Sequence, residues 1–126
     1  METKLTARQA FDAMTDFLET YYDQTYSKQI NCLLSDMDMS TWGDGNETAD
    51  PALWDDWLEC INGNDNLKPQ EAYKAVARFV SMRYALQPDE YIVALIKGMR
   101  ALNNDFLVNT LFWQQWLNAV KKELNS

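Results

Sequence analysis

The sequence predicts an all-α fold, a single domain over residues 1–126 with six helices in two tandem pseudo-repeats of three, about 5–62 and about 67–124. The first observation is an internal repeat, since Leu5–Met37 aligns without a gap with Leu67–Met99 and is identical at eight positions. The second is that apolar residues recur at helical spacing, and the third is that no segment gives a convincing strand pattern. A sequence that repeats itself usually repeats a structural unit.

The first helix of each unit is expected at about 6–23 and about 69–86. Thr6 followed by Gln9 is a capping-box pattern that favours a helix start. Pro69 falls in the first turn of the later helix, where its missing N–H is not needed. The stripes expected to be buried are Ala10, Phe11, Met14, Phe17, Leu18 and Tyr21, and in the second unit Ala72, Tyr73, Val76, Phe79 and Val80.

The second helix of each unit is expected at about 28–37, capped by Ser27, and at about 88–102, opened by Pro88. A short connection to the preceding helix would make each pair a helical hairpin. The inward positions are Ile30, Leu33, Leu34 and Met37, and in the second unit Ile92, Leu95, Ile96 and Met99.

The third helix of each unit carries a pair of tryptophans. Asp50 as the cap and Pro51 at the first position predict the start of one helix, Gly63 its end, and Asn109 the start of the other. The aligned faces are Trp54, Trp57, Leu58 and Ile61 against Trp113, Trp116, Leu117 and Val120. Because the tryptophan pairs are duplicated at helical spacing, we interpret them as core rather than as a ligand cage.

Composition indicates a packed globular protein, with 47% hydrophobic and 13% aromatic residues. No run of about 18 apolar residues could span a membrane. The N-terminal Met1–Lys4 lacks the apolar core of a secretory signal, so a cytoplasmic location is expected. Cys32 and Cys60 lie far apart inside apolar patterns and are expected to be buried, reduced thiols.

Catalysis is not expected, because the chain contains no histidine, the commonest general base and zinc ligand. It has no glycine-rich phosphate loop, and Asp55 and Asp56 would point about 100° apart on a helix. Two aspartate-rich stretches begin like calcium loops, but Thr41 and Ala49 stand where glycine is needed. The sequence therefore predicts no catalytic residue, no cofactor and no metal site.

Charge is divided unequally between the halves. Residues 1–63 carry 13 acidic and 3 basic residues, whereas residues 64–126 carry 6 and 8. No Lys or Arg lies between Lys28 and Lys68, a span that holds nine acids: Asp36, Asp38, Asp44, Glu47, Asp50, Asp55, Asp56, Glu59 and Asp65. These acids are either a solvated face with helix caps or a docking surface for a basic partner. Direct binding of nucleic acid is disfavoured, since phosphate would be repelled.

Trp42 lies in a polar stretch, residues 38–49, that is long for a connection between helices. Long connections in compact domains are often functional. A tryptophan exposed beside carboxylates would suit an interface anchor, and one that returns to the helices would be core. The sequence leaves both alternatives open.

Part of the chain resembles a known family. The motif residues are Asp44-Gly45, Thr48-Ala49-Asp50-Pro51-Ala52 and Trp54-Asp55-Asp56-Trp57-Leu58, with Ala10-Phe11, Phe17-Leu18-Glu19, Tyr21-Tyr22 and Leu33-Leu34-Ser35-Asp36 upstream. Over residues 10–58 this pattern is similar to the small immunity proteins of contact-dependent growth inhibition systems in Gram-negative bacteria. The resemblance implies a cytoplasmic protein that binds and neutralises the C-terminal toxin domain of a large exported effector, often a nuclease.

The charge pattern agrees with that implication. A nuclease domain carries Lys and Arg for phosphate, so an acidic face could occupy its site and block it stoichiometrically. The expected toxin-binding residues are Asp36, Asp38, Trp42, Asp44, Glu47, Asp55, Asp56 and Glu59. The partner is expected to be a basic toxin domain, with no membrane and no direct nucleic-acid contact. The alternative is a helical adaptor that binds a peptide or helix in an apolar groove between the two units.

Overall fold

The computed structural model describes residues 4–38, 51–84, 88–100 and 111–125. Within these ranges the chain forms six helices: α1 (Ala7–Thr25), α2 (Lys28–Met37), α3 (Pro51–Cys60), α4 (Pro69–Arg83), α5 (Glu90–Arg100) and α6 (Leu111–Leu124). The β pairing in the described ranges is an isolated bridge between Leu5 and Leu67. The predicted all-α fold class is therefore confirmed.

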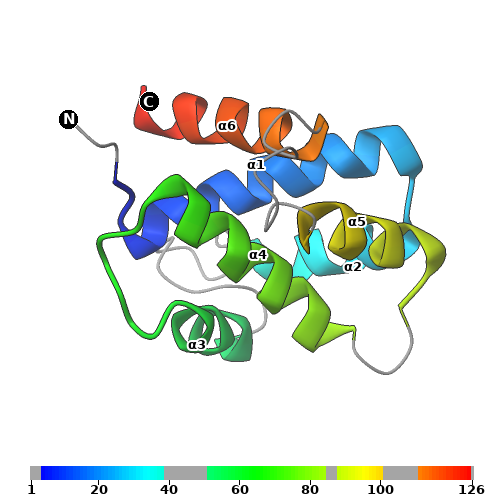
Figure 1. Ribbon diagram of the computed structural model, residues 1–126. Helices are drawn as coiled ribbons and strands as arrows, with labels where there is room; N and C mark the ends of the chain where they lie inside the picture. Colours follow the sequence, from blue (N-terminus) through cyan, green and yellow to red (C-terminus); the bar gives the residue numbers. More distant parts are fainter. Residues whose placement is uncertain (1–3, 39–50, 85–87, 101–110, 126) are drawn as a thin grey trace.

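The helices pack around one hydrophobic core (Figure 1). Helix α6 lies along α1 on one side of the molecule, and α3 lies on the opposite side against α4 (Figure 1). Helix α2 packs against α1 and α3, while α5 packs against α4 and α6. The acid-rich helix α3 therefore has one side on the core and the other on the surface.

The starts of α1 and α4 follow the predicted local chemistry. The Gln9 amide donates to Thr6 Oγ1 at 3.0 Å, and the Thr6 amide donates to Gln9 Oε1 at 2.9 Å. In α4, Pro69 takes the first position, and the Lys68 amide donates to Glu71 Oε1 at 2.9 Å. These contacts satisfy N–H groups that have no partner inside a helix. The end of α4 at Arg83 falls short of the predicted residue 86.

Helix α2 has its predicted bounds, with Ser27 Oγ accepting from the Ile30 amide at 3.3 Å. The predicted opening of α5 at Pro88 is wrong by two residues. Asp89 Oδ1 accepts from the Ile92 amide at 2.8 Å, so the carboxylate caps the helix and Pro88 precedes the cap. A carboxylate acceptor is favoured at this position because it satisfies a free N–H of the first turn.

Helix α3 ends in a Schellman motif. The Gly63 amide donates to the Leu58 carbonyl at 2.8 Å, and the Asn62 amide donates to the Glu59 carbonyl at 3.1 Å. Asn62 has φ of 54° and Gly63 has φ of 67°, so Asn62 is the first left-handed residue after the helix. The predicted stop at Gly63 is thus one residue late. The caps expected at Asp50 and Asn109 lie outside the described residues.

The core centres on two tryptophans that are 0% exposed. The Trp57 indole donates to the Ala7 carbonyl at 3.1 Å, and the Trp116 indole donates to the Pro69 carbonyl at 3.0 Å. Both indoles therefore bury their rings without leaving the N–H unsatisfied. Trp113 is also buried and Trp54 packs half-buried against the core, so the tryptophan pairs belong to the core.

Aligned positions of the two halves make matching contacts. Phe17 meets the Trp116 ring at 5.9 Å, and Phe79 meets the Trp57 ring at 6.0 Å, both edge to face. The alignment pairs Phe17 with Phe79 and the two tryptophans with each other. Edge-to-face pairs of this kind add stability beyond area burial. The duplication itself stays a prediction, supported by these matched contacts.

Two further contacts join aligned residues directly across the halves. Leu5 and Leu67 exchange reciprocal amide-to-carbonyl hydrogen bonds, each 2.8 Å long. The hydroxyl of Ser27, which caps α2, donates to Asp89 Oδ2 at 2.8 Å, and Asp89 caps α5. The polar contacts at both ends of the core therefore tie one half to the other.

One predicted burial is wrong. Cys60 is buried and carries a free thiol, but Cys32 is exposed. Because α2 places Ile30 and Leu33 inward, Cys32 falls two residues, or about 200°, from Ile30 and faces outward.

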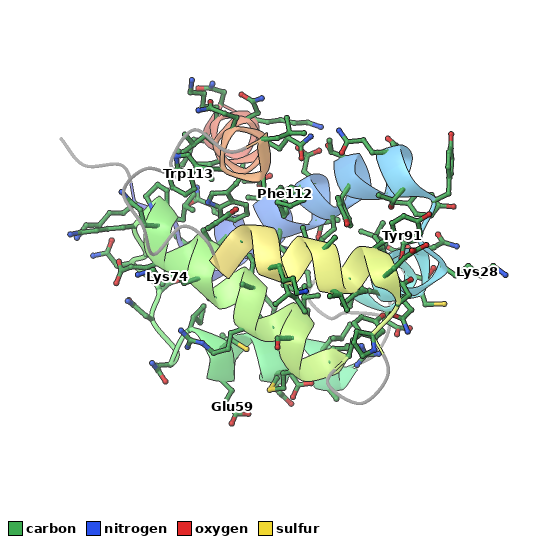
Figure 2. The ribbon with its side chains drawn as sticks, turned by 45° about the vertical axis from the view of Figure 1, so that its right-hand side comes forward. Lys28, Glu59, Lys74, Tyr91, Phe112 and Trp113 are labelled. Atoms are coloured by element: carbon green, nitrogen blue, oxygen red, sulfur yellow. The ribbon has the colours of Figure 1, made fainter. Side chains whose placement is uncertain are left out.

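Gly98 lets α5 and α6 approach closely. A Cβ atom built at Gly98 would lie 2.2 Å from Cε2 of Phe112. Phe112 is labelled in Figure 2, where it lies beside α5. We expect Gly98→Ala to lower the free energy of unfolding by about 1–3 kcal/mol through overpacking. This expected loss is the net effect, after the roughly 1 kcal/mol that alanine gains over glycine in a helix. Urea unfolding followed by far-UV circular dichroism measures the change.

The matched control for Gly98→Ala replaces the neighbouring ring with a smaller side chain that has no ring. In a Phe112→Leu background the same substitution should be less harmful, because the clashing ring atoms are gone. Gly98→Ala that stabilises the otherwise unchanged protein would contradict this account of the packing.

Candidate partner-binding surface

The outer side of α3 carries three carboxylates. Its inner side buries Leu53 and Trp57. At 100° per residue, Asp55, Asp56 and Glu59 fall within an arc of about 100° on the side away from Trp57. Asp55 and Glu59 are exposed and Asp56 is half-buried. Glu59 points away from the body of the protein at the lower edge of Figure 2.

We call Asp55, Asp56 and Glu59 the α3 acidic face. In the described ranges none of the three forms an ion pair with a Lys or Arg side chain. By contrast, two acids of α1 are neutralised: Asp12 by Arg8 at 3.2 Å and Asp16 by Lys122 at 2.9 Å. The α3 acidic face thus presents unneutralised charge to solvent, as a docking surface for cations requires.

The C-terminal end of α3 lies against α4. The Arg78 guanidinium donates from Nη1 to the Cys60 carbonyl at 2.8 Å, which suits the negative end of the helix dipole. Burial raises the pKa of the Cys60 thiol, Arg78 lowers it, and Asp56 and Glu59 raise it further. The carboxylates therefore favour the neutral thiol beside them.

Asp36 is used inside the fold. Its Oδ2 accepts from Arg83 Nη2 at 2.7 Å, which joins the end of α2 to the end of α4. Asp38 is exposed just after α2, and its amide donates to the Ser35 carbonyl at 3.3 Å. Of these two predicted site residues, Asp36 thus carries a charge that Arg83 partly neutralises.

The other three predicted site residues are Trp42, Asp44 and Glu47, which lie outside the described residues. Their place in the sequence is between Asp38 at the end of α2 and Pro51 at the start of α3. Because α2 packs against α3, the described predicted acids come from two neighbouring helices.

A second feature of this side of the molecule was not predicted. A hollow of about 250 Å³ opens between the end of α3 and α4. Its lining residues are Cys60, Ile61, Asn62, Asn64, Leu67, Glu71, Lys74, Ala75 and Arg78. The repeat alignment contains a signal that could have pointed to this place: Lys74 and Arg78 stand where the first unit has Asp12 and Asp16, so the charge is reversed.

The opposite side of the molecule holds two carboxyls close together. Burial raises the pKa of Glu123 in α6, and the charge of Asp12 and a hydrogen bond with it raise this pKa further. The ionised form of Glu123 is therefore disfavoured in the folded protein. The stability that the protonated form contributes is full below the unfolded-state pKa of about 4.5 and is lost as pH rises through the higher folded-state pKa.

We therefore expect Glu123→Gln to raise the melting temperature at pH 7 and to change it little at pH 4. Glutamine keeps the size of the side chain and cannot ionise, so the repulsion by Asp12 is removed. Thermal unfolding at the two pH values measures this difference. An equal change at both pH values would show that the effect is not one of ionisation.

Among the described helices, none combines the length with the apolar character needed to cross a lipid bilayer. The same residues contain no group of three or more Cys, Asp or Glu side chains placed to hold a metal ion. No protein-family model, curated protein or solved structure matches the chain.

Proposed function

We propose that this protein is an immunity protein of the contact-dependent growth inhibition type, which binds a basic toxin domain in the cytoplasm and blocks it stoichiometrically. The observation that carries the proposal is the α3 acidic face. Three carboxylates share one outward arc and make no ion pair within the described ranges. The sequence resemblance over residues 10–58 supports the same assignment.

The physical argument rests on the substrate of the toxin. A nuclease binds phosphate through clustered Lys and Arg side chains, so its active site is strongly cationic. Carboxylates held on a rigid helix can occupy that site and exclude the nucleic acid. Long-range attraction between the two faces would also speed association, which helps capture of the toxin before damage occurs. The proposal assigns no chemical step to this chain.

The proposed contact surface extends beyond α3. Asp38, at the end of α2, and the sequence neighbours Trp42, Asp44 and Glu47 complete it. Asp36 takes part more weakly, because Arg83 already shares its carboxylate. Trp42 would supply an apolar anchor within a charged rim, an arrangement common at tight interfaces.

The test of this function is a growth rescue. The C-terminal domain of the exported effector that the proposal pairs with this chain is expressed from an inducible promoter, with and without this chain in the same cytoplasm. We expect growth to be restored, and the two proteins to purify as a complex. Continued death despite folded, abundant chain would reject the immunity function and favour the adaptor hypothesis, in which affinity depends little on salt.

A further inference from the structure

The repeat alignment gives the hollow between α3 and α4 a counterpart between α6 and α1, and the two places differ. By the repeat alignment, α6 corresponds to α3 and α1 corresponds to α4. Helix α3 stops at Cys60 and the chain turns at Asn62 and Gly63. Helix α6 continues to Leu124, so its last turn occupies the place that corresponds to the turn after α3. The α4 side keeps an open hollow of about 250 Å³.

Charge differs between the two places in the same way. On α1, the acids Asp12 and Asp16 are paired with Arg8 and with Lys122 of the last turn of α6. Their aligned residues on α4 are Lys74 and Arg78, which line the hollow. Within the described ranges these two cations form no ion pair. The α3–α4 side, which lacks the covering turn, therefore also lacks the neutralising charge.

Lys74 and Arg78 lie four residues apart, so they project from the same face of α4. The Arg78 guanidinium donates one N–H to the Cys60 carbonyl and has four other N–H groups. The acid in the lining, Glu71, accepts from the Lys68 amide and caps α4. The apolar part of the lining comes from Ile61, Leu67 and Ala75, and all three are buried.

From this arrangement we propose that the hollow is a binding site for a carboxylate attached to a small apolar group. Arg78 would hold the carboxylate through its free N–H groups, and Lys74 would supply a second positive charge. The apolar group would contact the small exposed part of Leu67 and Ala75, which are 3% and 2% exposed. The volume lies below the range of about 300–1,000 Å³ typical of drug-sized ligands, so a short branched chain fits the site better than a large molecule.

Such a carboxylate can be a free small acid or the C-terminus of a polypeptide. The test uses both probes on the full-length, ¹⁵N-labelled protein. The first is 4-methylvalerate, with 4-methylvaleramide as its neutral match. The second is the peptide acetyl-Ala-Ala-Leu with a free C-terminus, matched by the same peptide with an amidated C-terminus. Amide chemical shifts are followed to saturation at low salt, where charge attraction is least screened.

We expect saturable shifts at Lys74 and Arg78 with a carboxylate probe and none with its neutral match. The acid that binds more tightly identifies the source of the carboxylate. Lys74→Gln and Arg78→Gln should each weaken binding at least about tenfold. Lys97→Gln, which removes an exposed charge from α5, should leave binding unchanged.

Two results would overturn the proposal: equal binding of the carboxylates and their neutral matches, or unchanged affinity in folded Lys74→Gln protein. Lys74→Gln keeps the test valid if loss of the Arg78 contact with Cys60 disturbs α3. The outcome is independent of toxin binding, because no toxin is present in the experiment.

Discussion

Replacing Trp116 with alanine is expected to lower the free energy of unfolding by about 3–5 kcal/mol. The side chain is 0% exposed, and its ring packs edge to face on Phe17 at 5.9 Å and against Tyr73 at 6.1 Å. Truncation removes a large buried apolar surface and leaves a cavity that α1 and α4 can only partly fill. Single domains are commonly stable by about 5–15 kcal/mol, so much of the margin would be lost.

Two control variants separate packing from hydrogen bonding. Trp116→Phe keeps an aromatic ring but removes the indole N–H that donates to Pro69 at 3.0 Å, so we expect a smaller loss of about 1–3 kcal/mol. Trp54→Ala removes a half-buried ring at the edge of the core and should be milder than Trp116→Ala. Urea unfolding monitored by circular dichroism gives all three values. If Trp54→Ala proves the most harmful, the core does not centre on Trp116.

If the proposed function holds, reversing two charges of the α3 acidic face is expected to slow association with the proposed toxin domain at least about tenfold. The variant carries Asp55→Lys and Glu59→Lys. Both side chains are exposed on the outward side of α3, so the fold should tolerate the change. The loss should appear mainly in the association rate, because long-range charge attraction accelerates encounter more than it strengthens the bound state. Stopped-flow fluorescence measures that rate.

The matched control places the same charge change elsewhere. Asp23→Lys with Glu90→Lys alters exposed acids on α1 and α5, and shifts the net charge by the same amount. Unfolding curves for both variants verify that each protein is folded. If the control slows association as much as the α3 variant does, net charge alone governs encounter. The α3 acidic face would then lose its special role.

Local interactions in this fold could be predicted from the sequence. The capping box of Thr6 and Gln9, the Ser27 cap and the position of Pro69 depend on residues within one helical turn. The buried stripes of α1 and α4 follow helical periodicity, which needs no knowledge of the partner element. The predicted end of α3 at Gly63 is one residue late, because Asn62 is the first residue in the left-handed conformation. Asparagine, like glycine, tolerates this conformation after a helix.

Contacts between distant residues could not be predicted. Asp65, one of the nine acids between Lys28 and Lys68, accepts from the Ala7 amide at 2.7 Å and so satisfies an N–H at the start of α1. Asp36 and Arg83 are 47 residues apart and meet only because α2 and α4 converge. Charge counts along a sequence therefore overstated the acids that lack a partner. Among the described residues of the proposed docking surface, Asp55, Asp56 and Glu59 are the ones that form no ion pair.

The hollow lined by Lys74 and Arg78 could have been suspected from the repeat alignment, which reverses the charge at those two positions. The alignment alone does not show that α3 ends early while α6 continues. That difference depends on the Schellman turn at Asn62 and Gly63, a feature of three-dimensional geometry.

The association rate of this chain with the proposed toxin domain, measured from about 0.01 M to about 1 M salt, tests the central claim most directly. Over this range the screening length falls from about 30 Å to about 3 Å. If the α3 acidic face captures a basic toxin, the rate falls steeply with added salt, and the fall is shallower for the Asp55→Lys and Glu59→Lys variant. A rate that stays constant across the range would contradict the account.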